Sequence, residues 1–546
     1  MAVINPSVTI VNGTVDNSPV GATTASTGKF TTLTSTGTAT LANGSTTYVQ
    51  AIGDASYPGV YAAGGTNTPL VLQPLGTGAL QAQKTDSSAT GGNARGANAV
   101  DWQTSRNSAG QVASGSSSVV GGGKVNTAAG FGTVVAGGDT NSANGQYTFV
   151  GGGTGNTANT NLGTIVGGST NTAAGYYNFI GAGFTNSGTS ASSVTTQSGT
   201  MNGTTAVTLS GSNASIKVGQ YITGTSIGSD TYVAAISGTS LTLSKVASGS
   251  STSTLSFFTP HGVVVGGGNN QATGSYSFIG GGGDAGTAAN RNVASGDWSV
   301  VAGGRNNTAS GIGSFIGGGG FDGSSAQANI ASGLTSVVGG GQANTASGTS
   351  SFVGGGVLNT ANTTGATVSG GYQNTANSGM GTVVGGRYGN TRSITGYLVF
   401  PAQNGAVAAG GGFSQAAMLI VGTQTTNATA TVLTCDAQAA GSTNQVILPS
   451  NSAYYFRGEV VAGVTGAGDT KGWSIEGVIK RGAGVATAAL VGTPTVTSLY
   501  ADTGAGTWTV TALADTTNGG LKITVTGQAS TTIRWVCSIR STEMTY

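Results

Sequence analysis

The chain has 546 residues, of which 100 are glycine, with 18 basic and 16 acidic residues and a formal net charge of +2. So small a net charge argues against a nucleic-acid partner, because phosphate contacts need a basic stripe. No apolar run reaches the roughly 18 residues of a membrane helix, so we expect no membrane insertion. The first residues also lack the basic and apolar regions of a signal peptide.

Strand-forming residues fill the stretches between the glycines. Val, Ile, Thr, Ser, Tyr and Phe dominate there, and no long window shows a 3.6-residue apolar period. The sequence therefore predicts an all-β protein. Its six expected regions are residues 1–47, 48–113, 114–187, 188–260, 261–394 and 395–546.

A repeat of 15 residues, lengthened in places to 22, runs through residues 114–187 and 261–394. Its marker is an asparagine that opens Asn-x-Ala, found at Asn126, Asn141, Asn156, Asn171, Asn270, Asn292, Asn307, Asn329, Asn344, Asn359 and Asn374. Asn390 follows later, with Arg392 in place of the alanine. The longer intervals carry extra residues at a glycine turn, which is typical of a coil with loops at one corner.

Fifteen residues accommodate one rung of two short strands and two turns. Glycine at one corner permits positive φ or a close backbone approach, and Asn and Ser at the other corner can bond local backbone groups. Stacked rungs pair as parallel strands about 4.8 Å apart. We therefore predict a parallel β-roll, or solenoid, of roughly twelve rungs.

Each rung also contains two adjacent apolar residues. These doublets include Val119-Val120, Phe149-Val150, Ile165-Val166, Phe315-Ile316, Val337-Val338, Phe352-Val353 and Val383-Val384. Neighbouring side chains of a strand point to opposite faces, so one member fills the interior and the other forms an outward stripe. Because a long apolar stripe is rarely left in water, we predict that the chain forms a homo-oligomer that covers this stripe. The sequence does not assign which member points inward.

Residues 188–260 interrupt the repeat. Val207 and Leu209 alternate with polar residues, as do Leu241 and Leu243. This alternation predicts strands with one buried face.

Charge and tryptophan concentrate toward the end of the chain. Residues 400–546 hold seven basic and seven acidic residues and three of the five tryptophans. In "WSIEGVIK" and "RWVCSIR" apolar and polar residues alternate, so Trp473 and Trp535 are expected in the core of a β-sandwich-like tip.

The polar residues of this region are candidates for recognition. Loops on a rigid β scaffold commonly carry binding, so we select Asp469, Lys471, Tyr500 and Asp502 from the loops 464–472 and 500–507. A second group lies on the expected strands and would form either cross-strand ion pairs or receptor contacts; it comprises Arg457, Glu459, Glu476 and Lys480.

Carboxylates and the single histidine are the candidate catalytic groups. Glycan cleavage uses two carboxylates roughly 5–9.5 Å apart, and Asp284 and Asp322 occupy equivalent corner insertions. We interpret them as solvated loop acids. His261 lies where the insert rejoins the repeat, and we interpret it as a junction residue. No catalytic residue, cofactor or metal ligand is predicted, and Cys435 and Cys537 are expected to be buried free thiols.

The repeat "NTASGTSSFVGGG" and its siblings resemble the head repeats of trimeric autotransporter adhesins (YadA-like, or Hep/Hag, repeats). The resemblance covers residues 114–183 and 261–394. It implies a left-handed parallel β-roll packed as a homotrimer.

Four other segments resemble bacteriophage tail proteins. "VNGTVDNSPVGATTASTGKF" resembles the amino-terminal segments of tail fibres and tail spikes, and "ATGGNARGANAVDWQTSRNS" resembles the lead-in to their rolls. "VGQYITGTSIGSDTYVAAISGTSLTLS" is similar to a small β-barrel module of phage structural proteins. "SAYYFRGEVVAG" and the segments after it resemble the carboxy-terminal domains of tail-fibre proteins.

Together these resemblances imply a homotrimeric phage tail fibre, made in the host cytoplasm and carried on the virion tail. Residues 1–47 would attach to other tail or baseplate proteins, and 48–113 would lead into the roll. Residues 395–546 would bind a host surface glycan or an outer-membrane receptor. We expect adsorption without enzymatic chemistry. The alternatives are a glycan-degrading tail spike with a carboxylate site between subunits, and a bacterial trimeric adhesin.

Overall fold

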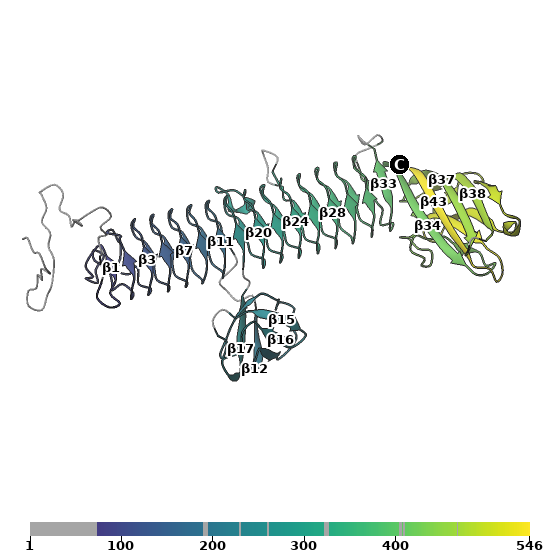
Figure 1. The fold of residues 1–546 in the computed structure, drawn as a ribbon. Coiled ribbons are helices and arrows are strands. Elements are labelled where there is room, and N and C mark those ends of the chain that lie inside the picture. Colours follow the sequence, from purple (N-terminus) through teal and green to yellow (C-terminus); the bar gives the residue numbers. More distant parts are fainter. Residues whose placement is uncertain are drawn as a thin grey trace, which may run out of the picture. The chain divides into compact units, whose positions relative to one another are not determined.

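The computed structural model describes residue 72 and residues 74–188, 195–228, 231–258, 261–321, 327–402, 407, 410–466 and 468–546. Apart from Leu72, these residues belong to one structural unit, Gln73–Tyr546. The predicted virion-attachment segment 1–47 lies outside the described residues. Helix is confined, in the described part, to three short 3₁₀ turns, η1 (Ala288–Asn290), η2 (Val485–Thr487) and η3 (Thr503–Ala505). The prediction of an all-β protein is confirmed (Figure 1).

A ladder of sixteen parallel strands forms one side of the β-roll. Its members are β1 (Leu80–Gln81), β2 (Val100–Asp101), β3 (Val119–Val120), β5 (Val134–Val135), β7 (Phe149–Val150), β9 (Thr164–Ile165), β11 (Phe179–Ile180), β18 (Val263–Val264), β20 (Phe278–Ile279), β22 (Val300–Val301), β24 (Phe315–Ile316), β26 (Val337–Val338), β28 (Phe352–Val353), β30 (Thr367–Val368), β32 (Thr382–Val383) and β33 (Leu398–Pro401).

Two shorter parallel ladders form the other side of the roll. The first comprises β4 (Thr127–Ala128), β6 (Ser142–Ala143), β8 (Thr157–Ala158) and β10 (Thr172–Ala173). The second comprises β19 (Gln271–Ala272), β21 (Val293–Ala294), β23 (Thr308–Ala309), β25 (Ile330–Ala331), β27 (Thr345–Ala346), β29 (Thr360–Ala361) and β31 (Thr375–Ala376).

The ladder has more rungs than the roughly twelve that the Asn-x-Ala motif predicts. The predicted count left out the rungs of β1, β2 and β33, and in the rung of β11 Asn186 is followed by Ser-Gly instead of by Ala at the second position. Strand pairing tolerates this variation because it uses backbone groups, which every residue supplies.

In most rungs the second member of the doublet fills the interior. Complete burial is shared by Val120, Val150, Ile316, Val338 and Val353, while their partners Val119, Phe149, Phe315, Val337 and Phe352 lie on the outer face. The predicted split into an inward and an outward residue is therefore confirmed, and its direction is now assigned.

Two predicted doublets are out of register by one residue. Ile165 and Val383 are the inward residues of their rungs, so their outward partners are Thr164 and Thr382. Val166, the other member of the predicted doublet, follows the strand and is exposed. A strand of two residues gives too short a pattern for the sequence to fix its register.

An internal ladder of asparagines links the rungs. In the rung of β27, the Asn344 side-chain amide donates to the carbonyl of Gly340 at 2.9 Å and to that of Gly356 at 2.8 Å. Its Oδ1 accepts the backbone N–H of Asn359 at 3.0 Å. Asparagine was expected to bond local backbone, but it also bonds the next rung, because its buried side chain points along the stack.

The glycines lie at the same corner as the asparagine side chain, not at the opposite corner as predicted. Glycine is required there by space as well as by backbone angle. Gly341 has φ +87°, and a Cβ there would lie 2.1 Å from the carbonyl oxygen of Gly356 in the next rung. Any larger residue would separate the rungs, because the corners stack backbone on backbone.

The inserted segment leaves the ladder unbroken. Phe179 before it pairs with Val263 after it, and Asn270 donates its backbone N–H to Asn186 Oδ1 at 3.1 Å. The insert itself is a six-stranded antiparallel sheet of β12 (Thr195–Asn202), β13 (Ala206–Leu209), β14 (Tyr221–Thr223), β15 (Val233–Ser237), β16 (Ser240–Leu243) and β17 (Ser250–Phe258).

The insert closes on itself as a barrel. Its edge strands β14 and β15 are joined by an antiparallel bridge between Tyr221 and Tyr232. The predicted inward residues Val207, Leu209, Leu241 and Leu243 are all buried in its core.

The roll continues directly into the tip, because β33 pairs with β32 on one side and with β34 (Ser414–Thr425) on the other. The larger tip sheet adds β37 (Ser452–Val464), β38 (Thr470–Arg481), β39 (Ala489–Leu490), β40 (Thr495–Ala501) and β43 (Ile533–Thr545). The smaller sheet contains β35 (Thr431–Val432), β36 (Val446–Ile447), β41 (Thr509–Asp515) and β42 (Gly520–Thr526).

Both tip sheets contribute to one hydrophobic core. Trp473 and Trp535 stack with ring centroids 5.6 Å apart, and Trp508 packs 5.9 Å from Trp535. All three are buried, as predicted for the first two. The tip is therefore a β-sandwich whose second layer comes from β35, β36, β41 and β42.

A buried ion pair joins the last rung to the tip. Arg392, which stands where other repeats have alanine, donates from Nε to Glu543 Oε2 at 3.1 Å. Glu543 also accepts bonds from Gln415 at 2.8 Å, from Ser541 at 2.8 Å and from the hydroxyl of Tyr397. Burial raises the pKa of Tyr397 well above its usual range, so this phenol stays protonated as a donor. The departure from the repeat at Arg392 thus has a structural cause.

Candidate functional site

The outward face of the larger tip sheet carries a recess. Residues of β34, β43 and β37 alternate strictly between the core and this face. Register places Met418 beside Arg540, and Arg540 beside Arg457, across three neighbouring strands. Alternation and pairing therefore bring together outward side chains from distant parts of the chain.

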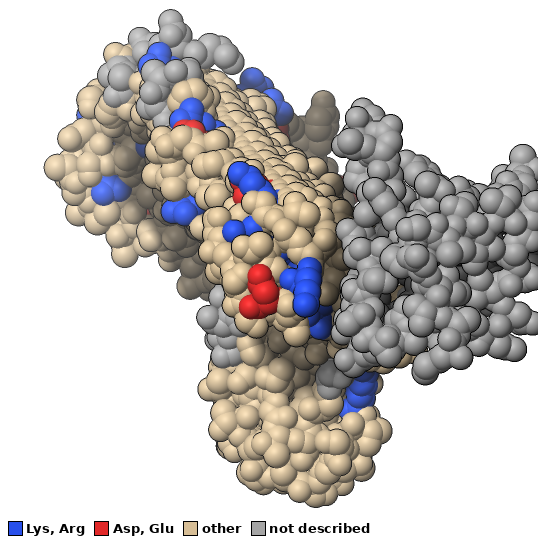
Figure 2. Space-filling view, turned by 90° about the vertical axis from the view of Figure 1, so that its left-hand side faces the viewer, with Lys and Arg blue, Asp and Glu red and all other residues tan. Residues whose placement is uncertain are grey.

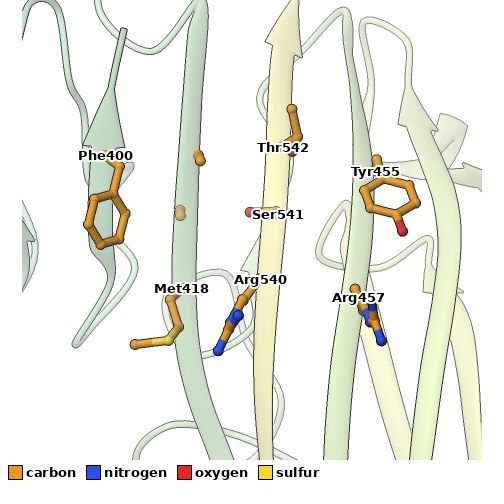
Figure 3. A pocket seen from close by; sticks show the side chains of 9 residues that line it. Phe400, Met418, Tyr455, Arg457, Arg540, Ser541 and Thr542 are labelled. Atoms are coloured by element: carbon orange, nitrogen blue, oxygen red, sulfur yellow. The ribbon is translucent and has the colours of Figure 1, made fainter.

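We call this recess the tip trough. It has a volume of about 530 Å³ and is lined by Phe400, Ala416, Ala417, Met418, Tyr455, Arg457, Arg540, Ser541 and Thr542. Figure 3 shows Phe400 and Tyr455 on opposite sides, with Thr542 and Ser541 between them and both arginines toward one end. Phe400 and Tyr455 stand on β33 and β37, with β34 and β43 between them, so their strands are roughly 14 Å apart.

The arginines of the trough are not neutralised within the described residues. Arg457 and Arg540 are directly opposite each other on β37 and β43, and neither makes an ion pair or hydrogen bond there. On its other side Arg457 is the cross-strand neighbour of Glu476 on β38. The Glu476 carboxylate accepts a bond from the Tyr455 hydroxyl at 2.7 Å, and this bond raises the pKa of Tyr455.

The residues selected from the predicted loops lie close together but differ in exposure, and Tyr500 lies on β40 and not in a loop. Asp469, Asp502 and Tyr500 are exposed, and Tyr500 is 84% exposed. The Asp502 carboxylate is tied to the backbone N–H of Thr470 at 2.8 Å. These three residues form an accessible group beside the ends of β37 and β40.

Lys471 is placed differently, because it faces the core of the sandwich. It is 7% exposed, and its ammonium donates to the carbonyl oxygens of Trp508 at 2.8 Å and Gly506 at 3.3 Å. It also lies 5.1 Å from the Trp473 ring centroid. These bonds hold Lys471 in a structural position that does not suit a receptor contact.

Of the two acids considered for catalysis, the structure describes Asp284. Asp284 pairs with Arg305 and accepts a bond from Asn290 at 3.1 Å. The Asn290 bond is the main reason that its pKa is lowered, so Asp284 stays ionised and does not resemble a general acid. Asp322, its predicted counterpart, lies outside the described residues.

His261 is part of a column of stacked rings at one corner of the roll. Its ring lies 4.8 Å from those of both Tyr177 and Tyr276, and burial lowers its pKa. Tyr276 in turn stacks on Trp298 at 6.2 Å with the ring planes 3° apart. This column supports cross-rung packing next to the insertion point.

Other chemistry is sparse in the described part of the chain. Cys435 and Cys537 are both free, as predicted; Cys537 is buried, whereas Cys435 is half-buried. Burial raises the pKa of Cys537 to about 12, which makes it a poor nucleophile. The described residues contain no group of three or more His, Cys, Asp or Glu side chains suited to a metal, and no helix among them could cross a membrane.

The outer face of the roll is apolar at regular intervals and carries few charges. The outward rings Phe149, Phe179, Phe278, Phe315 and Phe352 are each between 37% and 41% exposed. Lys, Arg, Asp and Glu are dispersed on the face shown in Figure 2. We call this row of outward doublet residues the roll stripe.

The trough residues were not selected from the sequence, with the exception of Arg457. Arg540 stands at a polar position of the alternating segment "RWVCSIR", whereas Tyr455 was not singled out. Their proximity depends on the register between β37 and β43, which are separated by a long stretch of chain. Phe400 and Met418 gave no signal, because an outward apolar residue looks like a core residue in a sequence.

Comparisons with known proteins give distant structural similarity and no sequence match. No family model and no curated protein matches the chain. Among solved structures, it is similar to the tailspike protein gp49 from Acinetobacter baumannii bacteriophage Fri1, described as a capsular polysaccharide depolymerase. The alignment covers 85% of this chain and 70% of that chain, at 9% identity and a TM-score of 0.22. It assigns no role to any residue of this chain.

This comparison corrects the prediction that the protein has no enzymatic activity. The matched tailspike is described as a depolymerase. Binding without chemistry is therefore withdrawn as an expectation for this chain.

Proposed function

We propose that the chain is a bacteriophage tail protein that engages a polysaccharide on the host surface through its tip. The resemblance of the repeats and of the flanking segments to tail fibres and adhesins supports a place on the virion tail. In this proposal residues 1–47 attach to other tail or baseplate proteins, the roll is a spacer, and residues 395–546 meet the host.

The tip trough is the observation that carries the proposal. Ligand sites are concave, largely apolar and supplied with a few placed polar groups. The rings of Phe400 and Tyr455 can bury the apolar faces of sugar rings, while Thr542, Arg457 and Arg540 offer hydrogen-bonding groups. Several tips acting on a repetitive polymer would raise the avidity without any new contact.

Cell binding by the full-length protein tests this function. Fluorescent protein is applied to a panel of bacterial strains and to mutants of each binding strain that lack the surface polysaccharide. We expect binding to disappear in those mutants. Phe400→Ala and Tyr455→Ala should each weaken it about tenfold, because each removes about 1.4 kcal/mol or more of ring burial.

The exposed loop variants Asp469→Ala, Tyr500→Ala and Asp502→Ala serve as the comparison set. If these variants lose binding while the trough variants keep it, the loops are the site. Binding that survives loss of the polysaccharide indicates an outer-membrane protein receptor. Failure to bind any strain in the panel contradicts the proposed function as a whole.

Cleavage of the bound polysaccharide is the second candidate activity, and the description of the matched tailspike favours it. A carboxylate pair for this chemistry could form between subunits. Incubation of the full-length protein with the purified polysaccharide, followed by assay of new reducing ends, decides between binding and cleavage.

We also propose that the protein is a homotrimer that covers the roll stripe. Each rung buries little more than one Val or Ile and one Ala in its interior, as Val338 and Ala346 illustrate. Such a narrow core supplies little hydrophobic stabilisation per residue, and covering the outward phenylalanines would add to it.

Charge introduced into the roll stripe should dissociate the assembly. We expect the double variant Phe315→Asp/Phe352→Asp to fall from trimeric to monomeric mass in multi-angle light scattering, because carboxylates cannot be buried there without partners. Leu334→Asp, at an exposed corner of the same region, is the control and should stay trimeric. A monomeric wild-type protein, or an unchanged mass in the double variant, contradicts the trimer.

A further inference from the structure

The outward face of the tip sheet has an excess of positive charge. The exposed positions of β37, β38 and β43 carry four basic side chains, Arg457, Lys480, Arg534 and Arg540, and two acidic ones, Glu459 and Glu476. The whole chain has only 18 basic residues, and four of them lie on this one face. This excess makes the face complementary to an anion.

The arrangement of Arg457 and Arg540 is unfavourable without a ligand. They are direct cross-strand neighbours, and like charges in that position repel each other. Glu476 faces Arg457 from the other side, but it is already bonded to Tyr455. Figure 3 shows the two arginine side chains splayed at the same end of the trough. An anion at that end would relieve the repulsion.

Guanidinium groups also select the form of the anion. Their planar fork matches the paired oxygens of a carboxylate or a phosphate, and they hold their charge at any physiological pH. The rings of Phe400 and Tyr455 sit in the same trough and favour a sugar next to the anionic group. A free inorganic anion would leave this apolar wall unused.

From these observations we propose that the tip trough recognises an acidic sugar, with Arg457 and Arg540 binding its carboxylate or phosphate and Tyr455 and Phe400 contacting the ring. This inference rests on the proposed function and narrows its ligand to anionic polysaccharides. It adds that binding should weaken as salt concentration rises, because counterions compete for the same two guanidinium groups.

The test uses the full-length protein and the purified surface polysaccharide of a strain that it binds. The polysaccharide is presented in three forms: untreated, with carboxyl groups reduced to hydroxymethyl groups, and with phosphate removed by hydrofluoric acid. We expect binding to fall at least tenfold for the form that has lost its charge. The form affected identifies the anion as a carboxylate or a phosphate.

Arginine variants locate the effect. Arg457→Ala and Arg540→Ala should each weaken binding to the untreated polymer about tenfold, and the double variant about a hundredfold. The double variant Arg457→Lys/Arg540→Lys should retain part of the affinity, because lysine keeps the positive charge but lacks the planar fork. Arg534→Ala is the matched control, because it is an exposed arginine on the same face that does not line the trough.

Three results would overturn the inference. Equal binding of all three polymer forms, with unaffected arginine variants, removes the acidic sugar while leaving polysaccharide binding intact. A change of oligomeric mass in the double alanine variant shows that the arginines contact another copy of the chain. Loss of affinity in Arg534→Ala as large as in the trough variants reduces the effect to general surface charge. Absence of binding to any polysaccharide contradicts the proposed function itself.

Discussion

Replacing Glu543 by alanine should lower the free energy of unfolding of the tip by about 3–5 kcal/mol, because it leaves the Arg392 guanidinium buried without its partner. Glu543 is 2% exposed and is the common acceptor for Arg392, Gln415, Ser541 and Tyr397. These donors come from the last rung, from β34 and from β43. Their loss should loosen the connection between roll and tip as well as the sandwich.

Hydrogen exchange and thermal unfolding measure this effect together. Exchange should accelerate in β33, β34 and the end of β43, while the rungs near β3 keep their protection. Glu459→Ala is the control, because Glu459 is an exposed glutamate on the same sheet. In a double-mutant cycle, Arg392→Ala and Glu543→Ala together should cost less than the sum of the two single variants. Additive effects, or an unchanged stability of Glu543→Ala, contradict a coupled buried pair.

Replacing Asn344 by alanine should destabilise the surrounding rungs by about 2–5 kcal/mol. The variant leaves the carbonyl of Gly340 and the backbone N–H of Asn359 without their bonds, in a position that is fully buried. Each such unsatisfied group costs about 1–3 kcal/mol. No other side chain of that size presents both a donor and an acceptor in this geometry without a charge.

Because each rung contacts only its neighbours, the damage should be local before it becomes global. Hydrogen exchange is expected to rise in β25, β27 and β29, and the thermal transition should broaden or split. Ser347→Ala, an exposed change in the same rung, should alter the stability by less than about 0.5 kcal/mol. Wild-type exchange rates in Asn344→Ala would show that the asparagine ladder does not contribute to stability.

The roll could be predicted in detail because residues close together in the sequence specify each rung. Fifteen residues specify one rung, so Asn344 and the Val337-Val338 doublet carry their signal within one copy and repeat it in the next. The direction of the doublet could not be predicted, because a strand of two residues looks the same from either face. The structure assigns it through the alanine of the opposite strand, which shares the interior with Val338.

The tip trough could not be predicted, since it depends on contacts between distant segments. Arg457 and Arg540 are separated by most of the tip sequence, and only the pairing of β37 with β43 makes them neighbours. For Lys471, contacts with a distant segment bury a residue that was predicted to be accessible. It looked like a loop residue beside Asp469, but it is the first inward position of β38 and bonds to the backbone beside Trp508.

Phe179 pairs with Val263, 84 positions later in the chain, so the inserted domain does not interrupt the ladder. The length of the roll and the domains inserted at its corners can therefore change independently during evolution. Gain or loss of a whole rung changes the reach of the roll in steps of about 4.8 Å, while every remaining rung keeps its neighbours. Gain or loss of a domain at a corner changes what the roll displays at a given height and leaves its reach the same. A gene of this kind can therefore exchange side domains and adjust length by separate, in-frame events, neither of which requires the other to be corrected.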